Sequence, residues 1–435
     1  MTALLSTAAR IATLAISLVC GVLTSRLAIG GAGIEYYAFL SLLVALPGLV
    51  MFSDLGTGAV VVTSVATSKN VRTDQLVQRQ VLSVMRIMLM FAATIATVNA
   101  VLMVSGSWSL LLGSSGDIPH ADLAAFCCVL IYCLTICLGI WQRLLLGLRK
   151  NPLIILLQGM TSPLALLIVW LLLTSQDEAL KSFLALGSFI ATALVAIAGF
   201  VTAAIMTRPI LGRAVRRLWR PRRYPGARVM DVGLPMLAQM LTNPISVAVP
   251  RYVLAILSTP VAVAQYALAG QVFFAVQALI AAAGVALWPQ FARARSAGKI
   301  KRGPYLLSLL FGTSVAFVTI VLLYVGPQLF GFISDGQLAI GNDLIIGFGI
   351  MMAMQALLYP LGMFIMDKPG IRFQVIPSLL MAVSTVVLTL ALVPSWGVLG
   401  PVTANALSVL VFQVIPYSIY IRRNRARLYG LTADE

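Results

Sequence analysis

The chain of 435 residues is 60% hydrophobic and only 10% charged, whereas ordinary soluble domains are roughly 45–50% apolar and about 25% charged. This composition excludes a soluble globular protein and predicts a chain that crosses a lipid bilayer many times. Lysine and arginine number 30 against 13 acidic residues, a net charge of +17, but these basic residues lie between hydrophobic stretches. We therefore expect them to set membrane topology and to contact membrane lipids, and we expect no nucleic-acid binding.

Twelve stretches are apolar over about 20 residues, the length that a helix needs to cross roughly 30 Å of hydrocarbon. The sequence therefore predicts an all-α integral membrane protein with 12 transmembrane helices. The predicted helices cover residues 9–30, 36–62, 81–105, 123–147, 153–174, 182–206, 232–256, 260–288, 305–331, 344–366, 374–394 and 398–421. The apolar run of the first is too long for a cleaved signal peptide, so it is expected to stay in the membrane.

Basic residues fall mainly on one side of these predicted helices. Of the 30 lysines and arginines, 25 lie in segments on that side, and the opposite loops carry Lys181 with most of the acids. Because short basic loops stay in the cytoplasm, both termini are predicted to be cytoplasmic.

The run of eight arginines between Arg208 and Arg228 divides the chain. It is expected to fix topology and to lie on anionic lipid. We predict a first six-helix lobe at 1–206, a basic cytoplasmic linker at 207–230, a second six-helix lobe at 231–421 and a cytoplasmic tail at 422–435.

The two predicted lobes have parallel topology, because each begins in the cytoplasm and has six helices. A short match indicates that they are repeats. Arg26, near the outer end of the first helix, precedes Tyr37, and Arg251, near the outer end of the seventh, precedes Tyr266. Each tyrosine is followed by alanine at the opening of the next helix. Chance can also produce a match this short.

Arg26 and Arg251 lie within apolar stretches, where a charge costs about 2.5–3.5 kcal/mol on insertion scales. One explanation is snorkelling, in which the guanidinium reaches the outer interface. The other is that both residues face a central cationic cavity and bind an anion, phosphate above all, in bidentate fashion. We take these two arginines as the candidate substrate-binding residues.

Three further charges lie near the cytoplasmic ends of predicted helices. Asp54 is too short to snorkel, and we expect it to pair with Arg86 or Arg143 in a structural charge cluster. Snorkelling is the alternative for the two arginines.

Uncharged amides offer hydrogen bonds to sugar hydroxyls if they line the same cavity. Interhelical hydrogen bonding, worth about 0.6 kcal/mol per contact, is the alternative for each. These candidate cavity residues are Gln158, Gln239, Asn243, Gln271, Gln277 and Gln355, with Asn405 and Gln413 as further members.

The sequence does not favour an enzyme. The longest predicted external loop, 106–122, offers only Asp117, His120 and Asp122 as acid–base groups. The chain has no Walker A motif. Its five cysteines resemble small apolar residues, so no catalytic residue, metal site or cofactor is expected.

Two stretches carry a family resemblance. The segment EYYAFLSLLVALPGLVMFSDLGTGAVV, and the segment LWPQFARA around Trp288 and Pro289, resemble the Wzx-like polysaccharide flippases of the multidrug/oligosaccharidyl-lipid/polysaccharide (MOP) exporter superfamily. The resemblance implies a two-lobed bundle in a bacterial inner membrane. It also implies export of a polyprenyl-pyrophosphate-linked oligosaccharide by alternating access, for cell-surface polysaccharide synthesis. Polymerase and glycosyltransferases of the same pathway are the implied partners.

Three other functions stay open from the sequence. The chain could be a cation-coupled multidrug exporter of the same superfamily, although such a protein needs acids in its cavity and Asp54 alone is available within the predicted helices. It could also be a membrane polymerase or glycosyltransferase, or a scaffold without transport.

Overall fold

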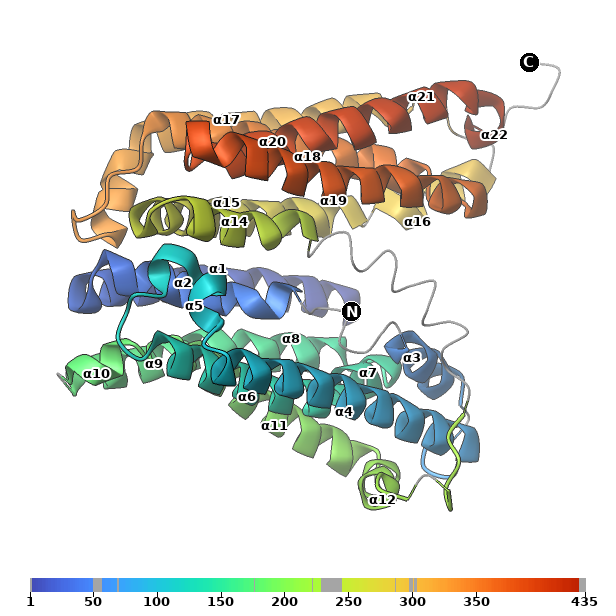
Figure 1. The fold of residues 1–435 in the computed structure, drawn as a ribbon. Helices are drawn as coiled ribbons and strands as arrows, with labels where there is room; N and C mark the ends of the chain where they lie inside the picture. Colours follow the sequence, from blue (N-terminus) through green and yellow to red (C-terminus); the bar gives the residue numbers. More distant parts are fainter. Residues whose placement is uncertain are drawn as a thin grey trace. The chain divides into compact units, whose positions relative to one another are not determined.

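The structure, a computed structural model, describes residues 2–49, 57–68, 70–175, 177–220, 222–227, 245–285, 287–296, 300 and 303–429. The chain divides into two compact units, Met1–Leu241 and Thr242–Glu435, which are treated one at a time. Every regular element in these described ranges is a helix (Figure 1). The fold is therefore all-helical in both units.

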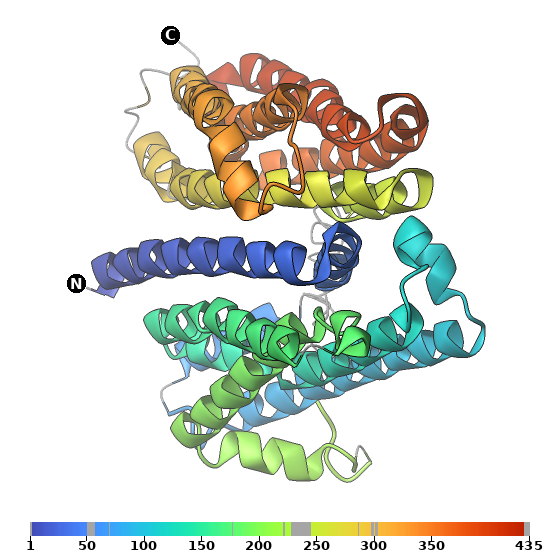
Figure 2. The ribbon, with the colours of Figure 1, turned by 90° about the vertical axis from the view of Figure 1, so that its left-hand side faces the viewer.

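The described part of the first unit contains five long helical stretches, the shorter apolar helix Ile34–Leu49 and several short helices. In both views α4, α6 and α11 lie side by side (Figures 1 and 2). Its elements are α1 (Thr2–Ala32), α2 (Ile34–Leu49), α3 (Gly58–Thr67), α4 (Gln75–Val104), α5 (Trp108–Leu112), the 3-10 helix η1 (Gly113–Ser115), α6 (Ala121–Leu138), α7 (Ile140–Gly147), α8 (Asn151–Gly159), α9 (Thr161–Thr174), α10 (Glu178–Lys181), α11 (Leu186–Met206) and α12 (Ile210–Arg217).

The second unit is built around α18, which packs against α15, α17 and α20. A π-helical turn, η2, joins α20 to α21. Its elements are α14 (Val249–Leu257), α15 (Pro260–Val285), α16 (Leu287–Ser296), α17 (Tyr305–Ile333), α18 (Asn342–Phe364), α19 (Lys368–Trp396), α20 (Leu399–Val409), η2 (Leu410–Val414), α21 (Ile415–Arg423) and α22 (Arg425–Tyr429).

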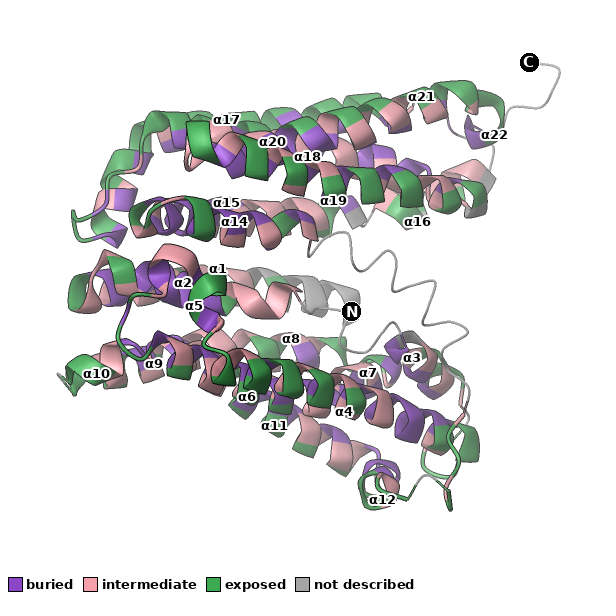
Figure 3. Cartoon of the chain, viewed as in Figure 1, coloured by how far each residue is buried: buried purple, intermediate pink, exposed green. Residues whose placement is uncertain are grey.

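Ten stretches of the described residues are long and apolar enough to cross a membrane, and they match ten of the predicted helices to within a few residues. Large apolar side chains are exposed along them, including Met90 at 70%, Phe317 at 67% and Ile376 at 66%. Figure 3 shows exposed positions running along the outer helices of each unit. Because a soluble protein rarely exposes so much contiguous apolar surface, these faces are suited to lipid. The protein is therefore a multi-pass membrane protein.

The other two predicted helices fall partly outside the described residues. The helix predicted at 36–62 includes most of α2, Ile34–Leu49, and the first part of α3, Gly58–Thr67, and residues 50–56 between them are not described. The helix predicted at 232–256 falls partly outside the described residues, and its described part is the short apolar helix Ile245–Leu257. A total of twelve crossings and cytoplasmic termini stay predictions.

Two predicted helices are interrupted. The stretch 123–147 forms α6 and α7, which meet at Gly139, and the stretch 153–174 forms α8 and α9, which meet at Met160. Pro163 explains the second break, since it has no N–H to donate to the carbonyl of Gly159 four residues earlier.

Basic residues of the first unit gather at the end that carries α12, the start of α4 and the turn between α7 and α8 (Figure 1). In the second unit, Arg295 of α16 donates from Nε to the carbonyl of Leu428 at 3.1 Å and from a terminal nitrogen to the carbonyl of Phe364. Both carbonyls belong to a buried apolar cluster that includes Tyr417 and Tyr429. Arg295 therefore ties the tail helix α22 to the end of α18.

Gly199 sets how closely α11 approaches α7. A Cβ atom at this position would overlap the ring of Trp141, which is itself only 1% exposed. We expect Gly199→Ala to lower the free energy of unfolding by about 1–3 kcal/mol through overpacking. Thermal unfolding of the purified protein in detergent measures this.

The matched control is Gly212→Ala in α12, where a Cβ meets no atom within 4 Å. Alanine favours a helix over glycine, so this variant is expected to be as stable as the wild type or slightly more so. Equal melting temperatures for the two variants would contradict the tight packing at Gly199.

Candidate functional site

The first unit has an open cavity of about 350 Å³ lined by α4, α6, α7, α8, α9 and α11, within the range of about 300–1,000 Å³ typical of small-ligand sites. Two residues singled out from the sequence, Arg143 and Gln158, both line it. The full lining is Met88, Tyr132, Thr135, Ile136, Gly139, Trp141, Gln142, Arg143, Gln158, Thr161, Thr192, Val195 and Ala196. None of these described lining residues is a carboxylate, so the cavity has cationic character.

Arg143 is positioned by the short helix α7. Trp141, Leu144 and Leu145 of α7 are buried in the core of the unit, whereas Arg143 is half-buried and lines the cavity. A guanidinium presents five N–H donors in a planar fork, which matches a phosphate or carboxylate. The geometry therefore places an anion-binding group in an otherwise neutral polar cavity.

The neutral polar lining is held by local bonds. Tyr132 donates to the carbonyl of Pro47 in α2 at 3.4 Å. The hydroxyls of Thr135 and Thr192 donate to carbonyls of their own helices at 2.7 Å, which leaves their oxygens able to accept. Tyr132, Thr135 and Thr192 were not identified from the sequence, because they lie in apolar stretches of α6 and α11 whose cavity-facing side only the packing of the helices reveals.

Arg26 and Arg251 occupy comparable places in their own units. Arg26 is half-buried on α1 next to Ser25, whose hydroxyl donates to the buried Tyr37 of α2 at 3.4 Å. Arg251 is half-buried on α14, and its guanidinium carbon lies 5.6 Å from the ring centre of the buried Tyr266 on α15. Each arginine is thus associated with the contact between the opening helices of its unit.

Amides of the second unit form a continuous chain of hydrogen bonds across four helices. Gln277 of α15 donates to Gln355 of α18, and Gln355 donates to Asn405 of α20 at 2.9 Å. Asn405, only 3% exposed, donates to the carbonyl of Ser246 at 3.3 Å. These side chains therefore join helices to one another.

Two further candidate amides of the second unit lie on α15 and in η2. Gln271 is half-buried on α15, and Gln413 of η2 donates to the hydroxyl of Ser378 on α19 at 3.1 Å. Gln239 and Asn243 lie outside the described residues. The structure thus brings Arg143 and Gln158 to one cavity and Gln277 and Gln355 to one network.

Gln355 is central to this network, because it accepts from one neighbour and donates to another. We expect Gln355→Leu to destabilise the second unit by about 1 kcal/mol. An interhelical hydrogen bond in a membrane contributes about 0.6 kcal/mol on average, and leaving a buried polar group without a partner costs about 1–3 kcal/mol. The expected loss lies where these two ranges meet. Unfolding monitored by tryptophan fluorescence in detergent measures the change.

Gln328→Leu on the exposed face of α17 is the control for this variant. It removes the same amide from a site outside the network and is expected to leave stability unchanged. A Gln355→Leu protein as stable as this control would show that the network contributes no stability.

Arg86 holds the basic linker against α4. Its guanidinium donates to the carbonyls of Arg217 at 3.0 Å, Leu218 at 3.1 Å and Tyr224 at 2.9 Å. The neighbouring Ser83 donates to the carbonyl of Ala227 at 2.9 Å. The carbonyls at the end of α12 have no partners inside the helix, so the arginine satisfies them and is itself stabilised.

The charge cluster expected from the sequence stays a prediction, because Asp54 lies outside the described residues. Of its two expected partners, Arg86 donates to backbone carbonyls and Arg143 lines the cavity. The sequence carries no signal for the contact, because its acceptors are main-chain groups that every residue possesses.

Removing the Arg86 guanidinium is expected to release the linker. We expect Arg86→Gln to speed tryptic cleavage between Arg213 and Arg223 by about tenfold or more, since three charge-assisted hydrogen bonds are lost. Timed digestion with mass mapping of the products measures the rate. Arg79→Gln, an exposed change on the same helix, is expected to keep the wild-type rate, and equal rates in both variants would contradict the proposed anchor.

No protein-family model matches this sequence, and no curated protein matches it either. Among solved structures, the lipid II flippase MurJ in an inward closed conformation has a TM-score of 0.70 at 13% identity, over 96% of this chain and 87% of that one. An inward-facing multidrug resistance transporter of the MATE family has a TM-score of 0.68 at 14% identity, over 98% of this chain and 100% of that one.

A third similar structure is a MOP superfamily transporter from Pyrococcus furiosus, with a TM-score of 0.55 at 13% identity over 97% of this chain and 96% of that one. At these identities the likeness concerns the fold. The chain therefore has the helical fold of transporters of the MOP superfamily, and the finer resemblance to Wzx-like flippases stays a proposal.

Proposed function

We propose that the protein is a flippase that moves a polyprenyl-pyrophosphate-linked oligosaccharide from the inner to the outer leaflet of a bacterial cell membrane. The cargo crosses by alternating access and serves cell-surface polysaccharide synthesis, beside polymerase and glycosyltransferases as partners. The fold shared with MOP transporters supports a transport function. The protein performs no covalent chemistry on its cargo in this proposal.

The charge inside the apolar helices carries the proposal. Within the ten long apolar stretches of the described residues, carboxylates occur only as Asp122 and Asp343, each the second residue of its helix. All other charged side chains in these stretches are arginines. Because a buried arginine is costly in a membrane, it is retained where it has a function or a partner.

Arginines suit a cargo with phosphate. A pyrophosphate carries about two negative charges and does not cross hydrocarbon unaided, and paired guanidinium forks bind its oxygens in bidentate fashion. Arg143 supplies such a group to the first unit's cavity, and Thr135, Thr192 and Gln158 add neutral polar groups suited to sugar hydroxyls. Arg26 and Arg251 are proposed to contact the pyrophosphate as it crosses.

A cation-coupled multidrug exporter is the second candidate. It is favoured by the TM-score of 0.68 with a MATE family transporter, nearly that of the flippase at 0.70. Binding a cation requires carboxylates within the membrane, however. Those of the described helices lie at helix starts, and Asp54, the one acid within the helices predicted from the sequence, lies outside the described residues. The arginine-rich interior therefore favours an anionic cargo.

The test uses cells that lack the protein and are complemented with the double variant Arg26→Ala, Arg251→Ala. We expect this variant to insert normally but to leave the completed lipid-linked oligosaccharide on the inner leaflet, with export reduced about tenfold or more. The cause is the loss of two charge-assisted contacts to the pyrophosphate. A membrane-impermeant probe of the glycan, followed by mass spectrometry of extracted lipids, measures the sidedness.

The control is Arg72→Ala, Arg423→Ala, which removes one exposed arginine from each unit and is expected to restore full export. Full export by the Arg26 and Arg251 variant as well would remove these residues from the mechanism. Unchanged lipid-linked sugars in cells without the protein, together with altered sensitivity to cationic dyes, would establish the drug exporter instead.

A further inference from the structure

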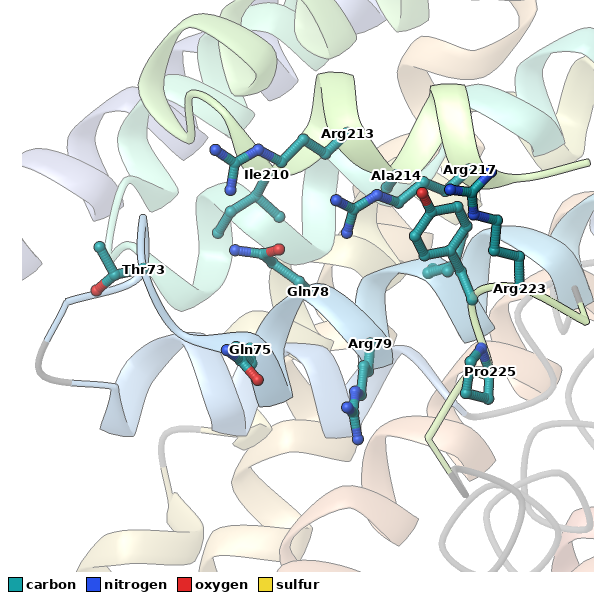
Figure 4. Close-up of a pocket in the computed structure, with 12 residues that line it drawn as sticks. Thr73, Gln75, Gln78, Arg79, Ile210, Arg213, Ala214, Arg217, Arg223 and Pro225 are labelled. Carbon is teal, nitrogen blue, oxygen red and sulfur yellow. The ribbon is translucent and has the colours of Figure 1, made fainter. Parts of the chain in front are cut away.

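A second pocket lies at the basic end of the first unit, apart from the cavity of Arg143. It has a volume of about 370 Å³ and lies between the start of α4, the helix α12 and the turn that follows α12. Figure 4 shows the side chains of Arg213 and Arg217 extending from α12 over the part of α4 that carries Gln78. The full lining is Thr73, Gln75, Gln78, Arg79, Leu82, Ile210, Arg213, Ala214, Arg217, Arg223, Tyr224 and Pro225.

The pocket concentrates positive charge without compensation. Four of its twelve lining residues are arginines and none is acidic. Among the described residues, ion pairs are recorded for Lys181 with Glu178 and for Arg427 with Asp367, both away from this pocket. Like charges gathered this closely repel one another, so an anion in the pocket stabilises the unit.

The nearest carboxylate along the chain, Asp74, is already engaged. It accepts a hydrogen bond from the Ser68 hydroxyl at 2.8 Å and caps α4 by accepting from the backbone N–H groups of Leu76 and Val77. These bonds, that of Ser68 foremost, lower the pKa of the Asp74 carboxyl. The carboxylate is thus oriented to the cap of α4.

The arginines are carried on an ordered scaffold. Ile210, Leu211 and Ala214 of α12 are buried against the unit, and Arg86 binds the carbonyls at the end of the helix. The guanidinium carbon of Arg217 lies 4.5 Å from the ring centre of Tyr224. A preorganised group loses less entropy when it binds a ligand, so this pocket differs from a mobile basic tail.

The position of the pocket indicates which anion it binds. It lies where the apolar stretch Gln75–Val104 begins, the depth at which lipid headgroups meet a transmembrane helix. Trp219, just beyond α12, is 78% exposed, and exposed indoles are enriched at this membrane interface. Both observations favour a lipid over a soluble anion.

We propose that this pocket binds the phosphate-bearing headgroup of an anionic phospholipid, with Arg213 and Arg217 as the principal ligands. Gln75, Gln78 and Thr73 supply neutral hydrogen bonds to the rest of the headgroup. In Figure 4, Arg79 extends away from Arg213, at another edge of the pocket. Such a lipid neutralises the arginines and fixes α12 to the membrane surface, whatever cargo the protein carries.

The experiment measures the melting temperature of the purified full chain in detergent against added lipid. The probes are dioleoylphosphatidylglycerol, dioleoylphosphatidylcholine as the zwitterionic lipid, and inorganic phosphate at matched ionic strength. We expect phosphatidylglycerol alone to stabilise the wild type. In Arg213→Gln, Arg217→Gln the apparent affinity is expected to fall about thirtyfold, the effect of two arginine–phosphate contacts at a membrane surface.

The matched control is Arg216→Gln, Arg220→Gln, which removes the same charge from the same segment at exposed positions outside the pocket lining. It is expected to keep the wild-type response. The single variant Arg213→Gln, whose exposed side chain makes no recorded contact within the described structure, preserves the fold and is expected to lose about fivefold in affinity.

Equal losses in the pocket variant and the control would overturn the proposal, because the effect would then follow net charge alone. Stabilisation by inorganic phosphate equal to that by phosphatidylglycerol would overturn the assignment to a lipid. Native mass spectrometry independently counts the phosphatidylglycerol molecules that stay bound to each chain. The proposal requires the pocket variant to retain one fewer than the control.

Discussion

Polar groups within helices that face hydrocarbon must find their hydrogen-bond partners inside the protein, since no water is there to supply them. In the second unit this constraint is met by one chain of hydrogen bonds that joins Gln277, Gln355 and Asn405 across three helices. At the ends of helices, arginines satisfy main-chain carbonyls: Arg86 donates to carbonyls at the end of α12, and Arg295 donates to the carbonyl of Leu428.

The described arginines lie in different surroundings. Arg86 and Arg295 donate to backbone carbonyls and hold neighbouring segments to their units. Arg143 lines a cavity whose described lining contains no acidic residue. A guanidinium on a cavity wall matches the geometry of a phosphate, which agrees with the proposed cargo.

Much of the fold could be predicted from the sequence, because apolar runs of about 20 residues are a strong signal. The helices at 305–331 and 344–366 correspond to Tyr305–Ile333 and Asn342–Phe364. The break at Met160 had a signal in the sequence, because Pro163 lies three residues later and cannot donate to the carbonyl of Gly159. The break at Gly139 had no such proline, and it was not predicted.

The candidate sites were less predictable than the helices. Arg143 was noted for its charge, but its place in a cavity depends on how α7 packs among α6, α8 and α11. The pocket between α4 and α12 brings Gln78 near residues more than 130 positions later. From the sequence alone, an amide such as Gln355 is equally consistent with lining a cavity and with joining two helices. The packing of α15, α18 and α20 shows that Gln277, Gln355 and Asn405 are hydrogen-bonded to one another.

The most direct test of the central claim is transport by the purified protein in liposomes that contain a polyprenyl-pyrophosphate-linked oligosaccharide in both leaflets. A glycan-cleaving enzyme added outside reaches only the outer leaflet. The account predicts that wild-type protein makes nearly all of the lipid cleavable, whereas protein-free liposomes plateau at roughly half. A plateau at half with folded protein present, while the same vesicles take up a cationic dye along an ion gradient, would contradict the account.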